Sequence, residues 1–108
     1  MSFKVLTTSD FKRDSKRLLK KYKSLKKEIL DLIVSLEEEP TQGTPLGNDC
    51  YKIRLAIASK GKGKSGGARV ITCAKVVDGF VYLLTIYSKS EKENISDKEL
   101  QELLKGLE

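Results

Sequence analysis

The chain has 108 residues, with 21 lysines and arginines against 15 acidic residues, no histidine and two cysteines. This length fits one domain over residues 1–108, and the net charge of +6 favours an anionic partner such as nucleic acid. The absence of histidine excludes a histidine general base, and two cysteines cannot complete a four-ligand zinc site. We therefore expect neither a metal ion nor another cofactor.

The charge is unevenly distributed along the chain. Residues 12–27 hold nine basic residues and one acidic residue, whereas residues 91–108 hold six acidic and three basic ones. One surface is therefore expected to be strongly positive. No stretch approaches the roughly 20 apolar residues of a membrane span, and the start has no apolar signal core, so we expect a cytoplasmic protein with no membrane partner.

The first expected element is a short strand over residues 3–7, whose side chains alternate between two faces. Thr8, Ser9 and Asp10 then offer side chains that can cap a helix, and Pro40 ends the helical region that follows. The first 40 residues are thus expected to form a strand followed by helix.

Apolar residues recur through this helical region at the spacing of one helix face. They are Phe11, Leu18, Tyr22, Leu25, Ile29, Leu32, Ile33 and Leu36. The pattern leaves two alternatives open for residues 9–39: one long helix, or a helical hairpin in which Ser24 caps the second helix. A rod of about 30 residues is unusually long for a small domain, and a hairpin packed on a sheet buries more of the apolar face.

Residues 41–49 are rich in turn-forming types and connect the helical region to a strand over residues 50–56. In that strand Tyr51, Ile53 and Leu55 alternate with Lys52 and Arg54. The alternation predicts one face in the core and a basic face on the opposite side.

A second basic strand is expected in residues 68–77, where Arg69 and Lys75 share one face. If it pairs with the strand over residues 50–56, a cationic surface without a compensating carboxylate forms. Such a surface suits phosphate, because arginine matches phosphate oxygens in a two-pronged fork and lysine supplies a point charge. Cys50 and Cys73 lie in these two strands, so a disulfide is conceivable, but we expect buried reduced thiols.

Glycines and lysines alternate in the connecting loop, residues 59–67. The spacing matches weak nucleotide-binding motifs, which we reject because a β-branched run follows instead of a helix whose N-terminus could hold phosphate. Two interpretations remain: a hairpin loop kept soluble by its lysines, or a cationic finger in which Lys60, Lys62 and Lys64 contact the RNA backbone.

Asp78-Gly79 predicts a two-residue hairpin turn, and residues 80–87 predict a central strand because they are apolar at both parities. Ser96 and Glu99 form a capping box for a short last helix with a leucine face. The sequence thus predicts an α+β domain. An N-terminal strand and a helix or helical hairpin pack on a mainly antiparallel four-stranded sheet, and a short C-terminal helix follows.

Three segments carry a resemblance to a known family. Residues 45–55 read PLGNDCYKIRL, residues 67–71 read GARVI and residues 83–93 read LLTIYSKSEKE. In this order and spacing they resemble the RelE/HigB superfamily of toxins from bacterial type II toxin-antitoxin modules, in its HigB-like subgroup. The resemblance covers nearly the whole chain.

The resemblance implies a RelE-like fold and a ribosome-dependent endoribonuclease that cuts messenger RNA in the ribosomal A site. It also implies two partners. One is a cognate antitoxin, which would form a toxin-antitoxin hetero-oligomer with this chain, and the other is the ribosome with its mRNA and rRNA.

Carried over position by position, the resemblance assigns catalytic roles to Lys52 and Arg54 on one strand and to Arg69 on the next. The chain departs from the family after the last strand, where Ser90 replaces a catalytic arginine and Ser96 replaces a later tyrosine. The nearby substitutes are Tyr87, Lys89 and Lys92.

Cleavage of RNA by its own 2′-hydroxyl needs a base, cations that stabilise the phosphorane, and an acid for the leaving 5′-oxygen. Lys52 is the candidate base, because like charges from Arg54 and Arg69 favour loss of its proton. The two arginines would hold the phosphate. Tyr87 or Lys92 would act as the acid or stack on a base. This chemistry needs no metal.

Further basic residues are expected to bind the RNA backbone away from the scissile position. They are Lys16, Lys20, Lys60, Lys62, Lys64 and Lys89. Glu91 is the only carboxylate expected near the site, where it would orient or deprotonate a reacting group.

Two other functions stay open at this point. Ser90 in place of a catalytic arginine favours a non-catalytic toxin on the same scaffold, such as a gyrase-directed inhibitor. The basic composition alone also fits an RNA- or DNA-binding module without a toxin role.

Overall fold

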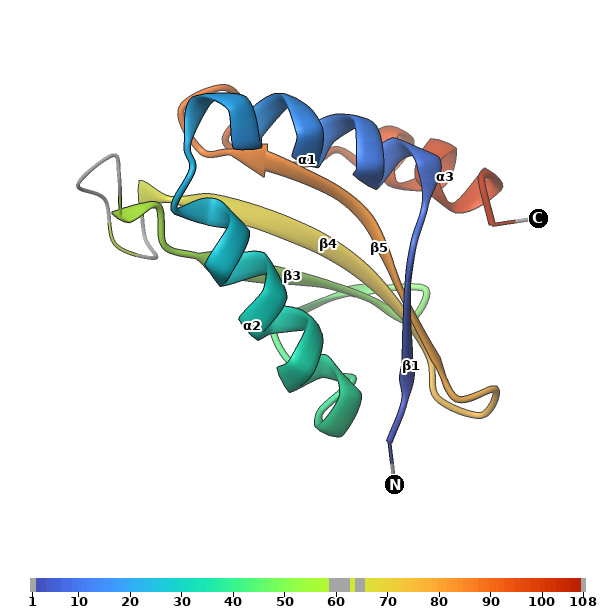
Figure 1. The fold of residues 1–108 in the computed structure, drawn as a ribbon. Helices are drawn as coiled ribbons and strands as arrows, with labels where there is room; N and C mark the ends of the chain where they lie inside the picture. Colours follow the sequence, from blue (N-terminus) through green and yellow to red (C-terminus); the bar gives the residue numbers. More distant parts are fainter. Residues whose placement is uncertain (1, 59–62, 64–65, 108) are drawn as a thin grey trace.

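The computed structural model describes residues 2–58, 63 and 66–107, which form one sheet with helices on both faces (Figure 1). The helices are α1 (Ser9–Lys21), α2 (Leu25–Glu38) and α3 (Asp97–Lys105). The strands are β1 (Lys4–Thr7), β2 (Thr44–Gly47), β3 (Cys50–Leu55), β4 (Ala68–Lys75) and β5 (Phe80–Ser88). The predicted α+β class is confirmed.

The five strands lie in the order β1-β5-β4-β3-β2, with β1 parallel to β5 and every other pair antiparallel. The prediction of four strands is wrong by one, because residues 44–47 of the expected connector pair with β3 as the edge strand β2. This strand reads TPLG, which is the composition of a turn. Its Pro45 is tolerated because an edge strand leaves one side unpaired.

The helical region forms two separate helices, which decides between the two alternatives left open by the sequence. Thr8 caps α1 as predicted, since its side-chain oxygen accepts a hydrogen bond from Phe11 N at 3.1 Å. Ser24 precedes α2 but has helical backbone angles, with φ −62° and ψ −19°, and makes no side-chain capping hydrogen bond. The capping role predicted for Ser24 is therefore wrong.

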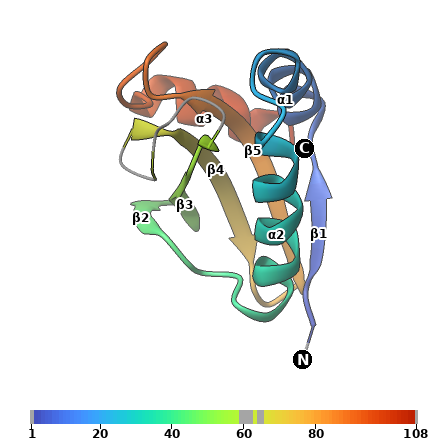
Figure 2. The same ribbon diagram turned by 60° about the vertical axis from the view of Figure 1, so that its left-hand side comes forward.

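The sheet separates α3 from α1 and α2 (Figure 2). A hydrophobic cluster covers each of its two faces. The cluster under α1 and α2 includes Leu18, Leu25, Leu36, Ile53, Val70 and Leu83. The cluster under α3 includes Cys50, Ile71, Cys73, Leu84, Tyr87 and Leu100. The alternation predicted for β3 is confirmed, because its apolar residues after Cys50 face α1 and α2 and its basic residues face the other side.

Strand β5 contains a β-bulge that changes which face its later residues occupy. The register with β4 skips Leu84, which is left without a residue opposite it. Leu83 before the bulge and Ile86 after it both face α1 and α2, whereas Tyr87 faces α3. Strict alternation from Leu83 would have placed Tyr87 on the face of α1 and α2. The predicted central strand, covered on both faces, is confirmed.

The β4–β5 hairpin has a four-residue turn over residues 76–79 instead of the predicted two-residue turn. A two-residue type I′ turn needs positive φ at both central residues. Gly79 has a φ of 80°, but Asp78 is not among the residues with positive φ. The hairpin prediction is right and the turn length is wrong.

Gly67, directly before β4, approaches β3 so closely that a side chain has no room. A Cβ at this position would lie 2.1 Å from Leu55 O and 3.1 Å from Ala56 Cα. Gly67→Ala should therefore push the two strands apart and lower the free energy of unfolding by about 2 kcal/mol or more. Urea unfolding followed by circular dichroism measures this change.

Gly63→Ala is the matched control in the same connection, because a Cβ at Gly63 meets no atom of the described residues within 4 Å. It should change the free energy of unfolding by less than about 0.5 kcal/mol. Equal stabilities for the two variants would contradict the close approach of Gly67 to β3.

Candidate functional site

A row of polar side chains crosses the three inner strands on the face that α3 covers. Arg54 of β3 lies directly opposite Arg69 of β4, and Arg69 lies directly opposite Tyr87 of β5. Opposite residues of paired strands project from the same face, so the three side chains form one row, here called the Arg-Arg-Tyr row. Like charges at opposite positions destabilise a sheet, and an anion such as phosphate would relieve their repulsion.

The two arginines of the row differ in exposure. Arg54 is exposed, whereas Arg69 is only 4% exposed and its Nη1 donates a hydrogen bond to Ala68 O at 3.1 Å. Arg69 is thus held within the sheet surface, whereas Arg54 is open to solvent. Water screens a buried guanidinium less than an exposed one, so Arg69 attracts a nearby anion more strongly.

Lys52 lies two residues before Arg54 on the same face of β3 and is half-buried. Its Nζ donates a hydrogen bond to Asn94 Oδ1 at 3.4 Å. Asn94 belongs to the segment between β5 and α3, so this contact brings that segment over the sheet face. The structure therefore brings Lys52, Arg54 and Arg69 together on one face, as the sequence predicted.

Tyr87 is 4% exposed, and its hydroxyl has no hydrogen-bond partner among the described residues. Burial and the negative charge of Glu99 raise the pKa of Tyr87, whereas the positive charge of Arg69 lowers it. The raising effects are the stronger ones. At neutral pH the phenol therefore keeps its proton and can donate it. Lys92 Nζ lies 5.3 Å from the ring centre, so one ring face is already occupied.

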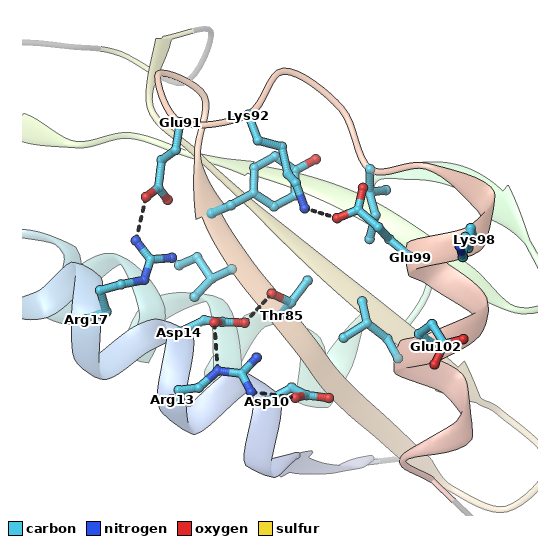
Figure 3. A pocket seen from close by; sticks show the side chains of 14 residues that line it. Asp10, Arg13, Asp14, Arg17, Thr85, Glu91, Lys92, Lys98, Glu99 and Glu102 are labelled. Atoms are coloured by element: carbon cyan, nitrogen blue, oxygen red, sulfur yellow. Dashed lines mark hydrogen bonds and ion pairs between the residues drawn. The ribbon is translucent and has the colours of Figure 1, made fainter.

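Lys92 forms an ion pair with Glu99 of α3 (Figure 3). Glu99 also accepts a hydrogen bond from Ser96 N, and Ser96 Oγ accepts one from Glu99 N, so the predicted capping box is confirmed. The sequence identified Glu99 only as a cap. Its contact with Lys92 spans an irregular segment, where residue spacing carries no signal of proximity.

Glu91 points toward α1 (Figure 3). Its carboxylate accepts a hydrogen bond from Ser88 N at 2.9 Å and pairs with Arg17 of α1. Glu91 thus fixes the turn after β5 to the helical layer. The expectation that it is the only carboxylate near the site is wrong, because Glu99 lies beside Lys92.

The predicted RNA-binding lysines are spread over the molecule. Lys89 is exposed directly after β5, and its N–H donates to Gly67 O at 3.0 Å, near the start of β4. Lys16 and Lys20 are exposed on α1, in the helical layer on the other face of the sheet. The remaining three lie outside the described residues: Lys60, Lys62 and Lys64.

A cavity of about 670 Å³ lies between α1, α3 and β5, beside Tyr87 (Figure 3). Five carboxylates and four basic side chains line it, so its charge nearly cancels. They are Asp10, Asp14, Glu91, Glu99 and Glu102, and Arg13, Arg17, Lys92 and Lys98. Asp14 Oδ2 also accepts a hydrogen bond from Thr85 Oγ1 at 2.6 Å. Phosphate is favoured less here than at the Arg-Arg-Tyr row.

Within the ranges that the structure describes, no three His, Cys, Asp or Glu side chains are grouped so that they could hold a metal ion. None of the described helices has the length and apolar character needed to cross a membrane.

An α+β domain with a mixed five-stranded sheet and a basic row on one sheet face defines the structural class of this protein. The fold is similar to that of the E. coli toxin RelE, solved in the free state with two arginine-to-alanine substitutions. The TM-score is 0.64 and the sequence identity 19%, over 97% of each chain. The model of the family described as the RelE toxin of the RelE/RelB toxin-antitoxin system matches residues 3–106. The chain therefore belongs to the RelE toxin family; its HigB-like subgroup stays a prediction.

Hydrogen bonding to Lys92 holds the pKa of Glu99 below its usual range, and the Ser96 N–H adds to the lowering. Lys92→Met should raise the pKa of Glu99 part of the way back, as measured by NMR titration of the carboxyl carbon. A lowered folded-state pKa contributes stability above the unfolded-state pKa, and this contribution is lost as the pH falls through the folded-state value. The part of the stability difference between wild type and Lys92→Met that depends on the Glu99 carboxylate should therefore be lost in acid.

Lys105→Met is the matched control, because it removes an ion pair of 3.3 Å with Glu102 on the same helix. It should leave the pKa of Glu99 unchanged. A Glu99 pKa that is the same in wild type and in Lys92→Met would show that the ion pair does not form in solution.

Proposed function

We propose that this RelE-family toxin is a ribosome-dependent endoribonuclease that cleaves messenger RNA by attack of the RNA's own 2′-hydroxyl. The observation that carries the proposal is the Arg-Arg-Tyr row, in which two guanidinium groups and a buried phenol share one sheet face with Lys52. Arginines suit the charge and shape of a phosphate, and a phenol that keeps its proton suits protonation of a leaving group.

In this mechanism Lys52 removes the proton of the 2′-hydroxyl, and the resulting oxygen attacks the adjacent phosphorus. Arg54 and Arg69 bind the non-bridging oxygens and stabilise the charge that develops on the phosphorane. Tyr87 gives its proton to the 5′-oxygen as the phosphorus–oxygen bond breaks. The products are a 2′,3′-cyclic phosphate and a 5′-hydroxyl, and no metal ion is needed. Lys92 is the alternative proton donor, and it must leave Glu99 before it can reach the phosphate.

The proposed partner that presents the message is the ribosome, whose rRNA and bound mRNA offer phosphate to the lysines outside the row. These contacts add affinity without reading the base sequence. As a RelE-family toxin the protein is one component of a toxin-antitoxin system. We place it in the cytoplasm, in a hetero-oligomer with a cognate antitoxin that covers the row or blocks entry to the ribosome.

A second candidate function is a non-catalytic toxin on the same scaffold, such as a gyrase-directed inhibitor. The observation that favours it is Ser90, which shares a 2.8 Å hydrogen bond with Ser88 Oγ and supplies no positive charge where the family's arginine is expected. Lys92, a cation of the same segment, is neutralised by Glu99. Cleavage of RNA separates the two candidates.

Induced expression of the chain should stop growth and produce cleaved messages, because the row is expected to act on RNA that the ribosome presents. Mapping of RNA 5′ ends after induction measures the cleavage, with a message lacking its start codon as the untranslated control. The cuts should be confined to translated messages. Arrested growth with intact messages and altered DNA supercoiling would favour the gyrase-directed alternative.

Arg69→Ala and Lys52→Ala should each lower cleavage by about 10²–10⁴-fold and change ribosome affinity only a few-fold, because both groups act on the transition state of one phosphate. The double variant Lys16→Ala, Lys20→Ala should instead weaken ribosome binding and flatten its salt dependence, because each lost backbone contact releases about one counterion fewer. Single-turnover cleavage and binding at several salt concentrations measure both effects.

Lys75→Ala is the matched control for Arg69→Ala. Lys75 lies on the same strand and the same face, but at the far end and 3.9 Å from Asp49 Oδ2. It should cleave like wild type. If all these variants show equal, salt-sensitive losses of binding, and Arg69→Ala keeps its cleavage rate, the row is a docking surface and the proposed roles are wrong.

A further inference from the structure

Cys50 and Cys73 form a pair of thiol side chains outside the proposed catalytic residues. They lie directly opposite each other on β3 and β4, on the same face as the Arg-Arg-Tyr row. Ala74 N donates to Asp49 O at 2.8 Å beside them, so the cysteines occupy a non-hydrogen-bonded pair, in which Cα atoms lie about 4.5 Å apart. A disulfide spans Cα separations of roughly 4.4–6.8 Å, so the spacing of this pair falls within the range that the bond allows.

The two sulfur atoms converge on one backbone oxygen. Asn48 O lies 3.4 Å from Cys50 Sγ and 4.0 Å from Cys73 Sγ, and both cysteines are free and buried. A hydrogen bond from the Cys50 thiol to Cys73 lowers the pKa of Cys73 and raises the pKa of Cys50. Burial raises the pKa of Cys73 in opposition to this hydrogen bond, and the positive charge of Lys75 lowers it further. Cys73 is therefore the thiol that ionises first.

A cavity of about 440 Å³ lies beside the residues that surround the pair. Asn48, whose carbonyl both thiols contact, lines it together with Leu104 and Leu107. These leucines, at the end of α3 and directly after it, pack against the cluster that holds both cysteines, so a reagent reaches the sulfurs only when they move aside.

We propose that Cys50 and Cys73 are a redox modification site, at which a low-molecular-weight disulfide such as oxidised glutathione converts the two thiols to one intramolecular disulfide. The Cys73 thiolate attacks one sulfur of the oxidant and releases a first glutathione thiolate. The Cys50 sulfur loses its proton, attacks the Cys73 sulfur and releases the second. Two protein thiols and one glutathione disulfide thus become one protein disulfide and two glutathione thiols, and excess reduced glutathione reverses the exchange.

The disulfide would join β3 to β4 four residues away from Arg54 along β3. It closes the chain segment over residues 51–72 into a loop, which restricts the unfolded chain and stabilises the folded one. Oxidation therefore fixes the strand register that aligns Arg54 with Arg69 and contacts neither side chain.

The test equilibrates the full chain with a series of ratios of reduced to oxidised glutathione, quenches with acid and measures the intact mass. The expected product is lighter by two hydrogen atoms, carries no glutathione, and unfolds at a temperature roughly 10 °C higher. Two outcomes would overturn the proposal. In one, the folded protein keeps both thiols at ratios that oxidise the urea-unfolded chain; in the other, bound glutathione is the final product.

Cys50→Ser and Cys73→Ser are the matched controls, because each keeps one thiol. Each should unfold at the same temperature in reducing and oxidising buffer. Phenylarsine oxide, which binds two neighbouring thiols at once, should bind the folded wild type in a ratio of about one to one and neither variant. A rise in unfolding temperature on oxidation of either single-thiol variant, or no arsenical binding by the wild type, would also overturn the assignment.

Discussion

The antiparallel register of β3, β4 and β5 is the constraint on which the site depends. It places Arg54 opposite Arg69 and Arg69 opposite Tyr87. A shift of one residue in either pairing would turn one of these side chains to the face of α1 and α2. The bulge at Leu84 belongs to this register, because without it Tyr87 faces away from the arginines. The hydrophobic clusters on both faces hold the register, since a shift would also expose buried side chains.

The residues of the candidate site lower the stability of the folded state. Two arginines at opposite positions repel each other, and burial of the Arg69 guanidinium and the Tyr87 hydroxyl removes polar groups from water. The hydrogen bond to Ala68 O offsets part of this cost at Arg69, whereas the Tyr87 hydroxyl finds no partner among the described residues. Helix α3 compensates by packing Leu100 in the same cluster as Tyr87 and by pairing Glu99 with Lys92. Helix α3 therefore both packs against this face of the sheet and contacts the residues of the candidate site.

Local patterns predicted most of this arrangement. The alternation in β3 predicted the face of Lys52 and Arg54, because a strand with one buried face has a period of two. Strand β2 escaped prediction because TPLG is stabilised by its pairing with β3 and not by its own composition. The bulge at Leu84 was not predicted because β5 is apolar at both parities. The sequence therefore does not show where the side chains change from one face of the sheet to the other. The Lys92–Glu99 ion pair escaped because it depends on how α3 docks on the sheet.

In the proposed mechanism the row cleaves a phosphodiester, and Tyr87 protonates the leaving oxygen. Tyr87→Phe removes only the hydroxyl, and general acid catalysis typically contributes 10²–10⁴-fold. The most direct measurement compares single-turnover cleavage by wild type and Tyr87→Phe on two ribosome-bound messages. One message is natural. The other carries sulfur in place of the leaving 5′-oxygen, and this sulfur departs without protonation. Tyr87→Phe should lose about 10²-fold or more of its rate on the natural message and almost none on the sulfur message. Equal losses on both would contradict this role of Tyr87.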